Sequence, residues 1–300
     1  MSNIKLLNGS EIPAIGFGPG SFIPKYVYKK DAGILYKIKS RLHRELIDKK
    51  NYINGIVESI NNGFRLIDYS AAYGDGKLIA EAICKSGVER RSLILTTRIS
   101  NSAQFQHTVK EEVFTQLEGF GTDYFDILML HWPVTGLYEN TWKEMIELRN
   151  KGYCRTLGVA NCNIHHLKRL FEISGEYPEI NQFEVHPLFT QVELRDFCKK
   201  QNIQVESYTP TARQDSRLMQ RPFLQDIAHK YKKNPTQIIL RWHIQNNMVP
   251  IVRSNNPQHI KNNSDVFDFE LTEKELKEID LLNINSRLRY DPDNCDFTML

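Results

Sequence analysis

Residues 154–185 read CRTLGVANCNIHHLKRLFEISGEYPEINQFEV, and this stretch sets out the repeating unit of the fold. Apolar residues run together over 156–160 and again over 180–185, which predicts two buried strands. Between them, apolar residues at helical spacing predict an amphipathic helix over 164–173. Two strands joined through a helix form a βαβ unit, in which the strands run parallel.

The same alternation continues in both directions along the chain. Further strands are expected over 14–18, 65–68, 93–97, 126–131, 204–208 and 249–252, and further helices over 52–61, 108–117, 142–150, 192–200 and 235–245. Because no composition break or Gly/Ser linker divides these eight units, they predict a single α/β domain over residues 1–300, a (β/α)8 TIM barrel. The Asn8-Gly9 turn between Ile4–Leu7 and Glu11–Ala14 adds an N-terminal β-hairpin.

A doubly wound parallel sheet is the competing fold class. Its first strand leads into the phosphate loop G-x-G-x-x-G, which opens a helix. Here residues 16–20 read GFGPG, so the third glycine is not at that spacing and Pro19 blocks the start of a helix. The barrel is therefore the predicted fold.

The composition excludes several classes of protein. Hydrophobic residues at 41% and charged residues at 25% are ordinary for a globular protein. The formal net charge of +3 is too balanced for a dedicated nucleic-acid binder, no apolar run is long enough to span a membrane, and the first residues lack the apolar core of a signal peptide. The five cysteines are odd in number and scattered, which argues against disulfides or a metal site and favours the reducing cytoplasm.

One segment departs from the barrel pattern. Residues 25–50, within an insertion over about 22–50 after the first strand, hold nine Lys or Arg against three Asp or Glu. Ile34, Ile38, Leu42 and Leu46 recur every fourth residue, which predicts a basic amphipathic helix. Either this helix lies over the barrel with its basic face in water, or the basic face docks an anionic substrate tail or an acidic partner.

Polar residues follow several of the predicted strands, where the active site of a parallel barrel gathers. The residues at or just past strand ends are Asp68, Arg98, His131, Asn161, Glu184, Tyr208 and Ser254. Tyr73 follows Asp68 by five residues, so its loop can fold back over the barrel mouth toward an Asp68–Arg98 pair. A tyrosine can act as a general acid when a nearby cation lowers its pKa. Taken singly, each residue also has a structural explanation, such as a salt bridge or a core aromatic ring.

The motifs, taken in order, resemble those of the aldo-keto reductase family, closest to its bacterial 2,5-diketogluconate reductase type. They are GFRLIDYSAAY at 63–73, LHWP at 130–133, GVAN at 158–161, INQFEVHP at 180–187, SYTP at 207–210, and Ser254 near the end of the last strand. The resemblance covers residues 4 to about 297 and implies the (β/α)8 barrel and NADPH-dependent reduction of carbonyl groups.

The resemblance also assigns roles to individual residues. It implies a catalytic tetrad of Asp68, Tyr73, Arg98 and His131. It implies nicotinamide contacts at Asn161, Gln182 and Tyr208, with the tyrosine stacked on the ring. The family binds NADPH in an extended pose without a glycine fingerprint, which agrees with its absence here.

The family has lysine at the position of Arg98. A guanidinium keeps the positive charge and could hold Asp68 through two hydrogen bonds, but it is larger and its charge is more diffuse than that of an ammonium group. We therefore expect Arg98 to support proton donation by Tyr73 less well than lysine does, while cofactor binding is retained.

The region that receives the cofactor 2′-phosphate departs from the family as well. Residues 251–254 read IVRS where the family has Ile-Pro-Lys-Ser, so Arg253 and Ser254 keep a cation and a hydroxyl. His259 stands where an arginine is expected, and Asn262 and Asn263 stand where an acidic residue and an asparagine close the motif. NADPH is accordingly the expected cofactor, with NADH as the alternative.

Four residues are expected around the substrate. Tryptophans of the family align with Gly20 and Ser100, and both losses should widen the pocket for a substrate bulkier than a simple aldehyde. Trp132 and Tyr290 complete this set, and Tyr290 belongs to a C-terminal tail over about 284–300 that closes over the substrate.

These features predict a cytoplasmic, monomeric enzyme that reduces a small-molecule carbonyl compound with NADPH. One alternative is a nicotinamide-cofactor-binding protein with little reductase activity, acting as a sensor or assembly partner. Another is a non-redox elimination or isomerisation on the same scaffold. Arg98 is the residue on which the choice depends.

Overall fold

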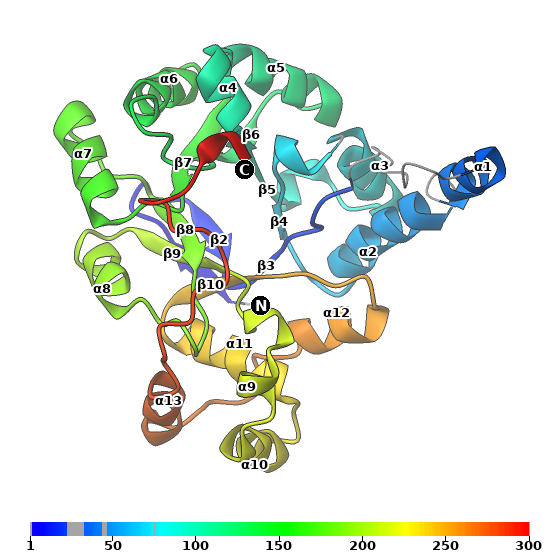
Figure 1. Cartoon of the computed structure of the whole chain (residues 1–300), viewed down its shortest axis with the longest axis vertical. Coiled ribbons are helices and arrows are strands. Elements are labelled where there is room, and N and C mark those ends of the chain that lie inside the picture. Colours follow the sequence, from blue (N-terminus) through cyan, green and yellow to red (C-terminus); the bar gives the residue numbers. More distant parts are fainter. Residues whose placement is uncertain (1, 23–32, 44–46, 75, 300) are drawn as a thin grey trace.

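The computed structural model describes residues 2–22, 33–43, 47–74 and 76–299. Its centre is a closed barrel of eight parallel strands in the order β10-β3-β4-β5-β6-β7-β8-β9, with helices around it (Figure 1). The predicted (β/α)8 barrel is therefore confirmed, and each strand lies within two residues of its predicted bounds.

The elements have the following bounds. The barrel strands are β3 (Gly16–Phe17), β4 (Leu66–Asp68), β5 (Ile94–Ile99), β6 (Phe125–Leu130), β7 (Cys154–Ala160), β8 (Ile180–Glu184), β9 (Gln204–Tyr208) and β10 (Met248–Val252). The described helices are α1 (Ile34–His43), α2 (Lys49–Asn61), α3 (Gly76–Ser86), α4 (Asn101–Gln106), α5 (Val109–Phe120), α6 (Tyr138–Asn150), α7 (Ile164–Ser174), α8 (Val192–Lys200), α9 (Ser216–Met219), α10 (Pro222–Tyr231), α11 (Pro235–Gln245), α12 (Pro257–Ser264) and α13 (Glu273–Asp280).

The N-terminal hairpin closes one end of the barrel. Strands β1 (Asn3–Lys5) and β2 (Glu11–Pro13) pair antiparallel, with Ile4 opposite Ile12, as predicted from the Asn-Gly turn. Ile12 and Leu6 are buried in a cluster with residues near the strand starts, among them Leu66 and Ile180. The opposite end, where the strands finish, is left for the site.

The C-terminal segment crosses that open end. After α13 the chain runs over the face of the barrel and finishes in a short 3-10 helix, η5 (Phe297–Met299), beside α4 (Figure 1). The Asn101 side chain donates a hydrogen bond to the Phe297 carbonyl at 3.1 Å, and the Phe297 ring packs on Trp132. This segment is the tail that the sequence analysis expects to close over the substrate.

The basic insertion is described only in part, because residues 23–32 and 44–46 lie outside the described ranges. A helix is present as predicted, α1, but it projects from the rim beyond α2 and α3 and does not lie over the barrel (Figure 1). Ile34, expected on its apolar face, is 77% exposed. Leu46, the last residue of that face, lies outside the described residues.

None of the helices in the described ranges is long and apolar enough to cross a lipid bilayer.

Candidate active site

One cavity of about 1040 Å³ opens at the C-terminal ends of the barrel strands. Thirteen of the fifteen predicted site residues line it: Gly20, Asp68, Tyr73, Arg98, His131, Trp132, Asn161, Gln182, Tyr208, Arg253, Ser254, His259 and Asn263. They come from most of the barrel strands and their loops, so the closed topology brings them together. Ser100 and Tyr290 do not line the cavity.

Arg98 lies fully buried on the floor of the cavity, in β5 beside β4. Its Nη2 donates to Asp68 Oδ1 at 2.6 Å and to Gln182 Oε1 at 2.7 Å, and its Nη1 donates to the Tyr69 carbonyl at 2.8 Å. Burial lowers the pKa of Arg98, but Asp68, Tyr73 and Glu206 outweigh it and raise the pKa above its usual value. The expected Arg98–Asp68 pair is present. It has one hydrogen bond in place of the two expected, because Nη1 of Arg98 donates to the Tyr69 carbonyl.

Tyr73 and His131 meet edge to face, with ring centroids 5.9 Å apart. Burial, and after it the charges of Arg98 and Arg289, lower the pKa of His131 to about 3. His131 is therefore a neutral imidazole near pH 7, which can donate a hydrogen bond but has no extra proton to give. The Tyr73 hydroxyl makes no hydrogen bond with any described residue, so it is available to a bound molecule.

Glu206 lies behind this group and was not predicted. Its Oε2 accepts a hydrogen bond from Gln182 Nε2 at 2.8 Å, while its buried Oε1 has no partner among the described residues. Burial and the Asp68 charge raise the pKa of Glu206 to about 8, against the opposing effects of Gln182 and Arg98. The sequence could have indicated Glu206. Side chains alternate along β9, so residues 204 and 206 lie on the same face of the strand as the predicted Tyr208.

Asn161 and Tyr208, which both line the cavity, are hydrogen-bonded to each other. The Tyr208 hydroxyl donates to Asn161 Oδ1 at 2.7 Å, and Asn161 Nδ2 donates to the His131 carbonyl at 3.0 Å. Asn161 has a positive φ of 61°, a conformation that asparagine tolerates better than most residues. The Tyr208 ring therefore lies fixed at the cavity wall, with burial raising its pKa.

Arg253 lines the cavity beside Gly20. A Cβ atom added to Gly20 would lie 2.4 Å from Cζ of Arg253, and Gly20 has a positive φ of 73°. The space that a larger residue at position 20 would take is thus held by the arginine, so the expected widening of the pocket at this position is not observed. Arg253 makes no ion pair with the described residues.

The loop after β9 forms a further wall. Four of its non-glycine residues have positive φ: Thr209, Ala212, Arg213 and Gln214. Such conformations cost on the order of 1 kcal/mol or more each and persist where a site requires them. Thr209, Arg213 and Gln214 line the cavity, and the buried Thr209 hydroxyl has no partner among the described residues.

Ser100 has a structural role in place of the predicted substrate contact. It caps α4 by accepting the Ala103 N–H at 3.1 Å, and its hydroxyl donates to Glu112 at 2.5 Å. Serine is one of the residues favoured at the N-cap, the position directly before a helix, and Ser100 directly precedes α4. Tyr290 is 53% exposed, and its neighbour Arg289 lines the cavity in its place.

Glu184 fixes the tail over the mouth. Its carboxylate is fully buried at the end of β8, where it accepts the backbone N–H of Leu288 at 2.6 Å and that of Arg289 at 2.8 Å. His186 Nε2 lies 3.0 Å from the same carboxylate. Burial raises the pKa of Glu184, but these three hydrogen bonds outweigh it and lower the pKa.

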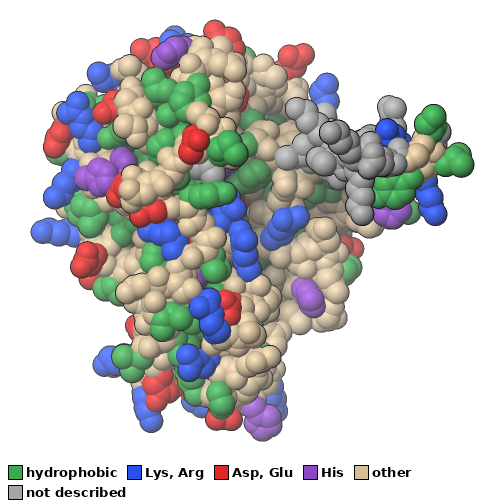
Figure 2. Space-filling model, in the orientation of Figure 1, with side chains coloured by type: hydrophobic (Ala, Val, Ile, Leu, Met, Phe, Trp, Pro, Cys, Tyr) green, Lys and Arg blue, Asp and Glu red, His purple; other side chains and the backbone are tan. Residues whose placement is uncertain are grey.

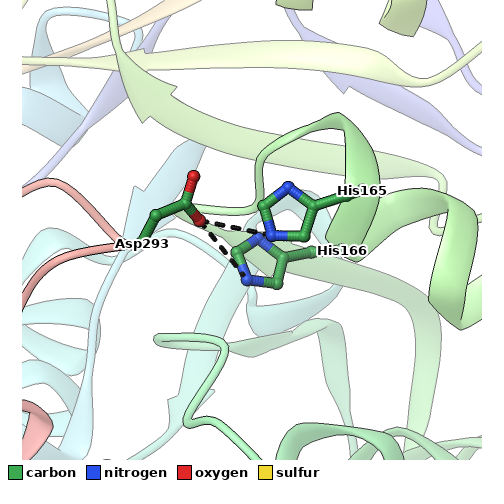
Figure 3. A group of neighbouring side chains, drawn as sticks. All are labelled: His165, His166 and Asp293. Carbon is green, nitrogen blue, oxygen red and sulfur yellow. Dashed lines mark ion pairs between the residues drawn. The ribbon is translucent and has the colours of Figure 1, made fainter.

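A second link holds the tail to α7 (Figure 3). Asp293 Oδ1 lies 3.3 Å from Nε2 of His165 and 3.7 Å from Nε2 of His166. His166 Nδ1 accepts the Asn163 backbone N–H, so the neutral ring carries its proton on Nε2, toward Asp293. A metal ion would need that nitrogen free, so the geometry favours a hydrogen-bonded link between tail and helix.

Comparisons with known proteins identify the family of the chain. The sequence model of the Aldo/keto reductase family matches residues 42–284. Glyoxal reductase of Bacillus subtilis (strain 168) is 34% identical over 294 residues, which are 98% of this chain and 97% of that protein. Methylglyoxal reductase DkgA of Escherichia coli (strain K12) is 37% identical over 243 residues, 80% of this chain and 88% of that protein.

A solved structure supports the same relationship. The Bombyx mori aldo-keto reductase AKR2E4, determined in complex with NADP, superposes with a TM-score of 0.83 at 31% identity, covering 97% of this chain and 96% of that one. The resemblance seen in the motifs is therefore confirmed. This chain belongs to the aldo/keto reductase family.

Proposed function

We propose that the protein is an oxidoreductase that reduces the carbonyl group of a small molecule to an alcohol with NADPH. The observation that carries the proposal is that Tyr73, His131 and the Asp68–Arg98 pair line one cavity together with two arginines that have no ion partner among the described residues. Two relatives named as reductases of glyoxal and methylglyoxal, and a relative solved with NADP, support it.

The residues of the cavity fit such a cofactor. Arg213 and Arg253 line it without an ion partner among the described residues, and they suit the phosphate groups. Ser254, His259 and Asn263 line the cavity as well, and they would complete the contacts to the cofactor. The unpartnered Thr209 hydroxyl is a further contact for a polar ligand. Asn161, Gln182 and the Tyr208 ring would hold the nicotinamide.

The chain's own residues then have distinct tasks. Bound NADPH supplies the hydride. Neutral His131 orients the carbonyl oxygen through a hydrogen bond, and Tyr73, whose hydroxyl is free, gives that oxygen a proton. Arg98 keeps a positive charge near Tyr73, and Asp68 holds Arg98 in place.

We also propose that the substrate is bulkier than a simple aldehyde. The support for it is that neither position 20 nor position 100 carries an aromatic side chain; the cavity of about 1040 Å³ has to hold the cofactor as well as the substrate. Trp132, buried under the Phe297 ring, forms part of its wall, so the tail and this tryptophan together would bound the substrate.

A cofactor-binding protein with little reductase activity is the second candidate. It is favoured by one observation, which is that Arg98 directs its hydrogen bonds to Asp68, Tyr69 and Gln182 and none to the Tyr73 hydroxyl. Without that contact, Tyr73 receives less help as an acid than from a lysine ammonium.

Two measurements test the proposal. Quenching of tryptophan and tyrosine fluorescence should report NADPH binding in the micromolar range. NADPH oxidation should then be followed with a panel of neutral aldehydes and ketones, and Tyr73→Phe should abolish it. Binding without oxidation across the panel would favour the second candidate, and no binding of NADPH or NADH at millimolar concentration would contradict both.

A further inference from the structure

Helix α1 turns apolar side chains toward water. Ile34, Leu35 and Tyr36 follow one another in its first turn and are all exposed, Leu35 to 83%. Single exposed apolar residues are ordinary on a protein surface, whereas contiguous apolar surface marks a site of interaction. The start of α1 carries such a group.

The same helix carries positive charge. Lys39 lies one helical turn after Leu35, so the two share a side of α1, and both are exposed. The helix reads ILYKIKSRLH, with three Lys or Arg and no Asp or Glu. The acidic group that the described structure brings to α1 is Asp48, whose Oδ1 lies 3.5 Å from Nδ1 of His43. The exposed side of α1 is therefore both apolar and basic.

The position of α1 leaves this side accessible to a large partner. The helix projects beyond α2 and α3, away from the barrel (Figure 1). Figure 2 shows hydrophobic side chains together with Lys or Arg side chains on this projection. None of the described residues of α1 lines the cavity, so the helix is not placed to receive the anionic tail of a substrate bound there.

The residue types favour a lipid surface over an acidic protein. Of the nine basic residues over 25–50, seven are lysine and two are arginine, and the same stretch holds three tyrosines. Interfaces between proteins are enriched in arginine and depleted of lysine. Lysine-rich segments instead bind the anionic headgroups of membranes, and tyrosine concentrates where a membrane meets water.

The length of α1 defines how it would meet a membrane. Ten residues of helix extend about 15 Å, which is about half of the hydrocarbon thickness of a bilayer. A basic helix of this kind lies along the surface, with its apolar side chains between the headgroups and its lysines beside the phosphates.

We propose that α1 is a membrane-association surface that binds bilayers containing anionic phospholipids. Ile34 and Leu35 enter the boundary between headgroups and acyl chains, and Lys37 and Lys39 contact the phosphate groups. The rest of the protein stays in water, and the association is reversible.

The first test is flotation of the full chain with two kinds of vesicle, phosphatidylcholine alone and phosphatidylcholine mixed with phosphatidylglycerol. The protein should float with the mixed vesicles and not with phosphatidylcholine alone, and added salt should weaken the binding. Leu35→Ser and the double variant Lys37→Glu/Lys39→Glu should each reduce the affinity by about tenfold or more.

Each variant has a matched control. Leu281→Ser removes a leucine that is 82% exposed and lies outside the insertion. Lys199→Glu/Lys200→Glu changes the net charge by the same amount at exposed positions on α8. Both controls should bind the mixed vesicles as the unaltered protein does.

Leu35→Trp reports whether the apolar side enters the bilayer. The three native tryptophans are buried, so the added one is the tryptophan that meets the lipid. Its emission should shift to shorter wavelength with the mixed vesicles and stay unchanged with phosphatidylcholine.

Four results would overturn the inference. They are no flotation with the mixed vesicles at low salt, equal binding to both kinds of vesicle, equal losses in the α1 variants and their controls, and an unshifted emission of Leu35→Trp. Salt-sensitive binding to polyglutamate without vesicle binding would assign α1 to an acidic protein instead. None of these measurements uses a substrate or a cofactor, so their outcome is independent of the proposed reductase function.

Discussion

Gln182 accepts a hydrogen bond from Arg98 through its side-chain oxygen at 2.7 Å and donates one to Glu206 through its side-chain nitrogen at 2.8 Å. Since a guanidinium can only donate, this contact fixes which end of the amide is oxygen. Gln182 Nε2 also approaches Asp68 at 3.4 Å, so both of its protons are directed into the floor. Gln182 Oε1 accepts no second hydrogen bond from the described residues.

The substitution Arg98→Lys tests what the arginine does to catalysis. Lysine gives up the bonds to Tyr69 and Gln182 and can place a compact ammonium against the Tyr73 oxygen, which makes the tyrosine a better acid. We expect turnover on a neutral aldehyde to rise by about tenfold or more, with NADPH affinity nearly unchanged. Steady-state NADPH oxidation measures the first and fluorescence titration the second.

Arg90→Lys is the matched control for that experiment, because Arg90 pairs with Asp126 at 2.8 Å away from the cavity. It should leave turnover unchanged. If Arg98→Lys lowers turnover on the preferred substrate, the arginine serves another purpose, such as binding a substrate anion.

Glu206→Gln should stabilise the protein at alkaline pH. The folded-state pKa of Glu206 is raised to about 8, above its usual value of 4.5. An unfolded chain releases this proton near pH 4.5, so the carboxyl costs stability increasingly as pH rises from about 4.5 to about 8. Glutamine still accepts from Gln182 Nε2 and carries no charge. We expect Tm to exceed that of the unaltered protein by about 2 °C or more at pH 8, with little difference at pH 5.

Thermal unfolding of both proteins across that pH range measures this effect. A difference in Tm that is the same at every pH would show that Glu206 does not hold its proton in the folded state.

His166→Gln should reduce the sensitivity of the fold to acid. Burial, with the His165 charge, lowers the pKa of His166 to about 4, although Asp293 opposes this. Because the folded pKa is below the unfolded value of 6.5, the stability that neutral His166 provides is present above pH 6.5 and is lost as pH falls toward 4. Glutamine can still accept the Asn163 N–H at the start of α7. The loss of unfolding free energy between pH 7 and 5 should shrink by about 1 kcal/mol.

Denaturant unfolding at the two pH values gives this quantity. His229→Gln, at an exposed position on α10, is the control and should leave the loss unchanged. An identical acid loss in His166→Gln would mean that the ring accepts a proton in the folded state as readily as in the unfolded one.

His259→Arg should tighten the binding of NADPH more than that of NADH. His259 lines the cavity, as do Arg253 and Ser254, and we assign these residues to the 2′-phosphate. An arginine there adds a charge-assisted hydrogen bond to the phosphate, and we expect about tenfold tighter NADPH with NADH nearly unchanged. Parallel titrations with both cofactors measure the difference. Equal effects would show that residue 259 does not face the phosphate.

The sequence predicts the barrel and most of the site because both follow from strand order. Asp68 and Arg98 end neighbouring strands, so their pairing could be expected from position alone. Ser100 does not line the cavity, because its side chain turns back to cap α4, and alignment with a tryptophan could not show this. Ile34 was expected to be covered, yet periodicity shows which residues share a face and not whether anything packs on it.

Arg289 could not be predicted as a cavity residue from the sequence. It belongs to a segment without helix or strand, where no periodicity indicates direction. Its place depends on Glu184, more than a hundred residues earlier, whose burial and two backbone contacts only the tertiary structure reveals.

The contact between Glu184 and the tail has a consequence for how specificity evolves. The carboxylate holds the N–H groups of residues 288 and 289, which every amino acid except proline possesses. The side chains at these positions can therefore be substituted while the backbone keeps its place over the mouth of the cavity. Selection, in nature or in a directed-evolution library, can exchange the side chain that lines the cavity at position 289 without rebuilding the support beneath it. A saturation library at position 289 should thus yield folded proteins at nearly every codon but proline.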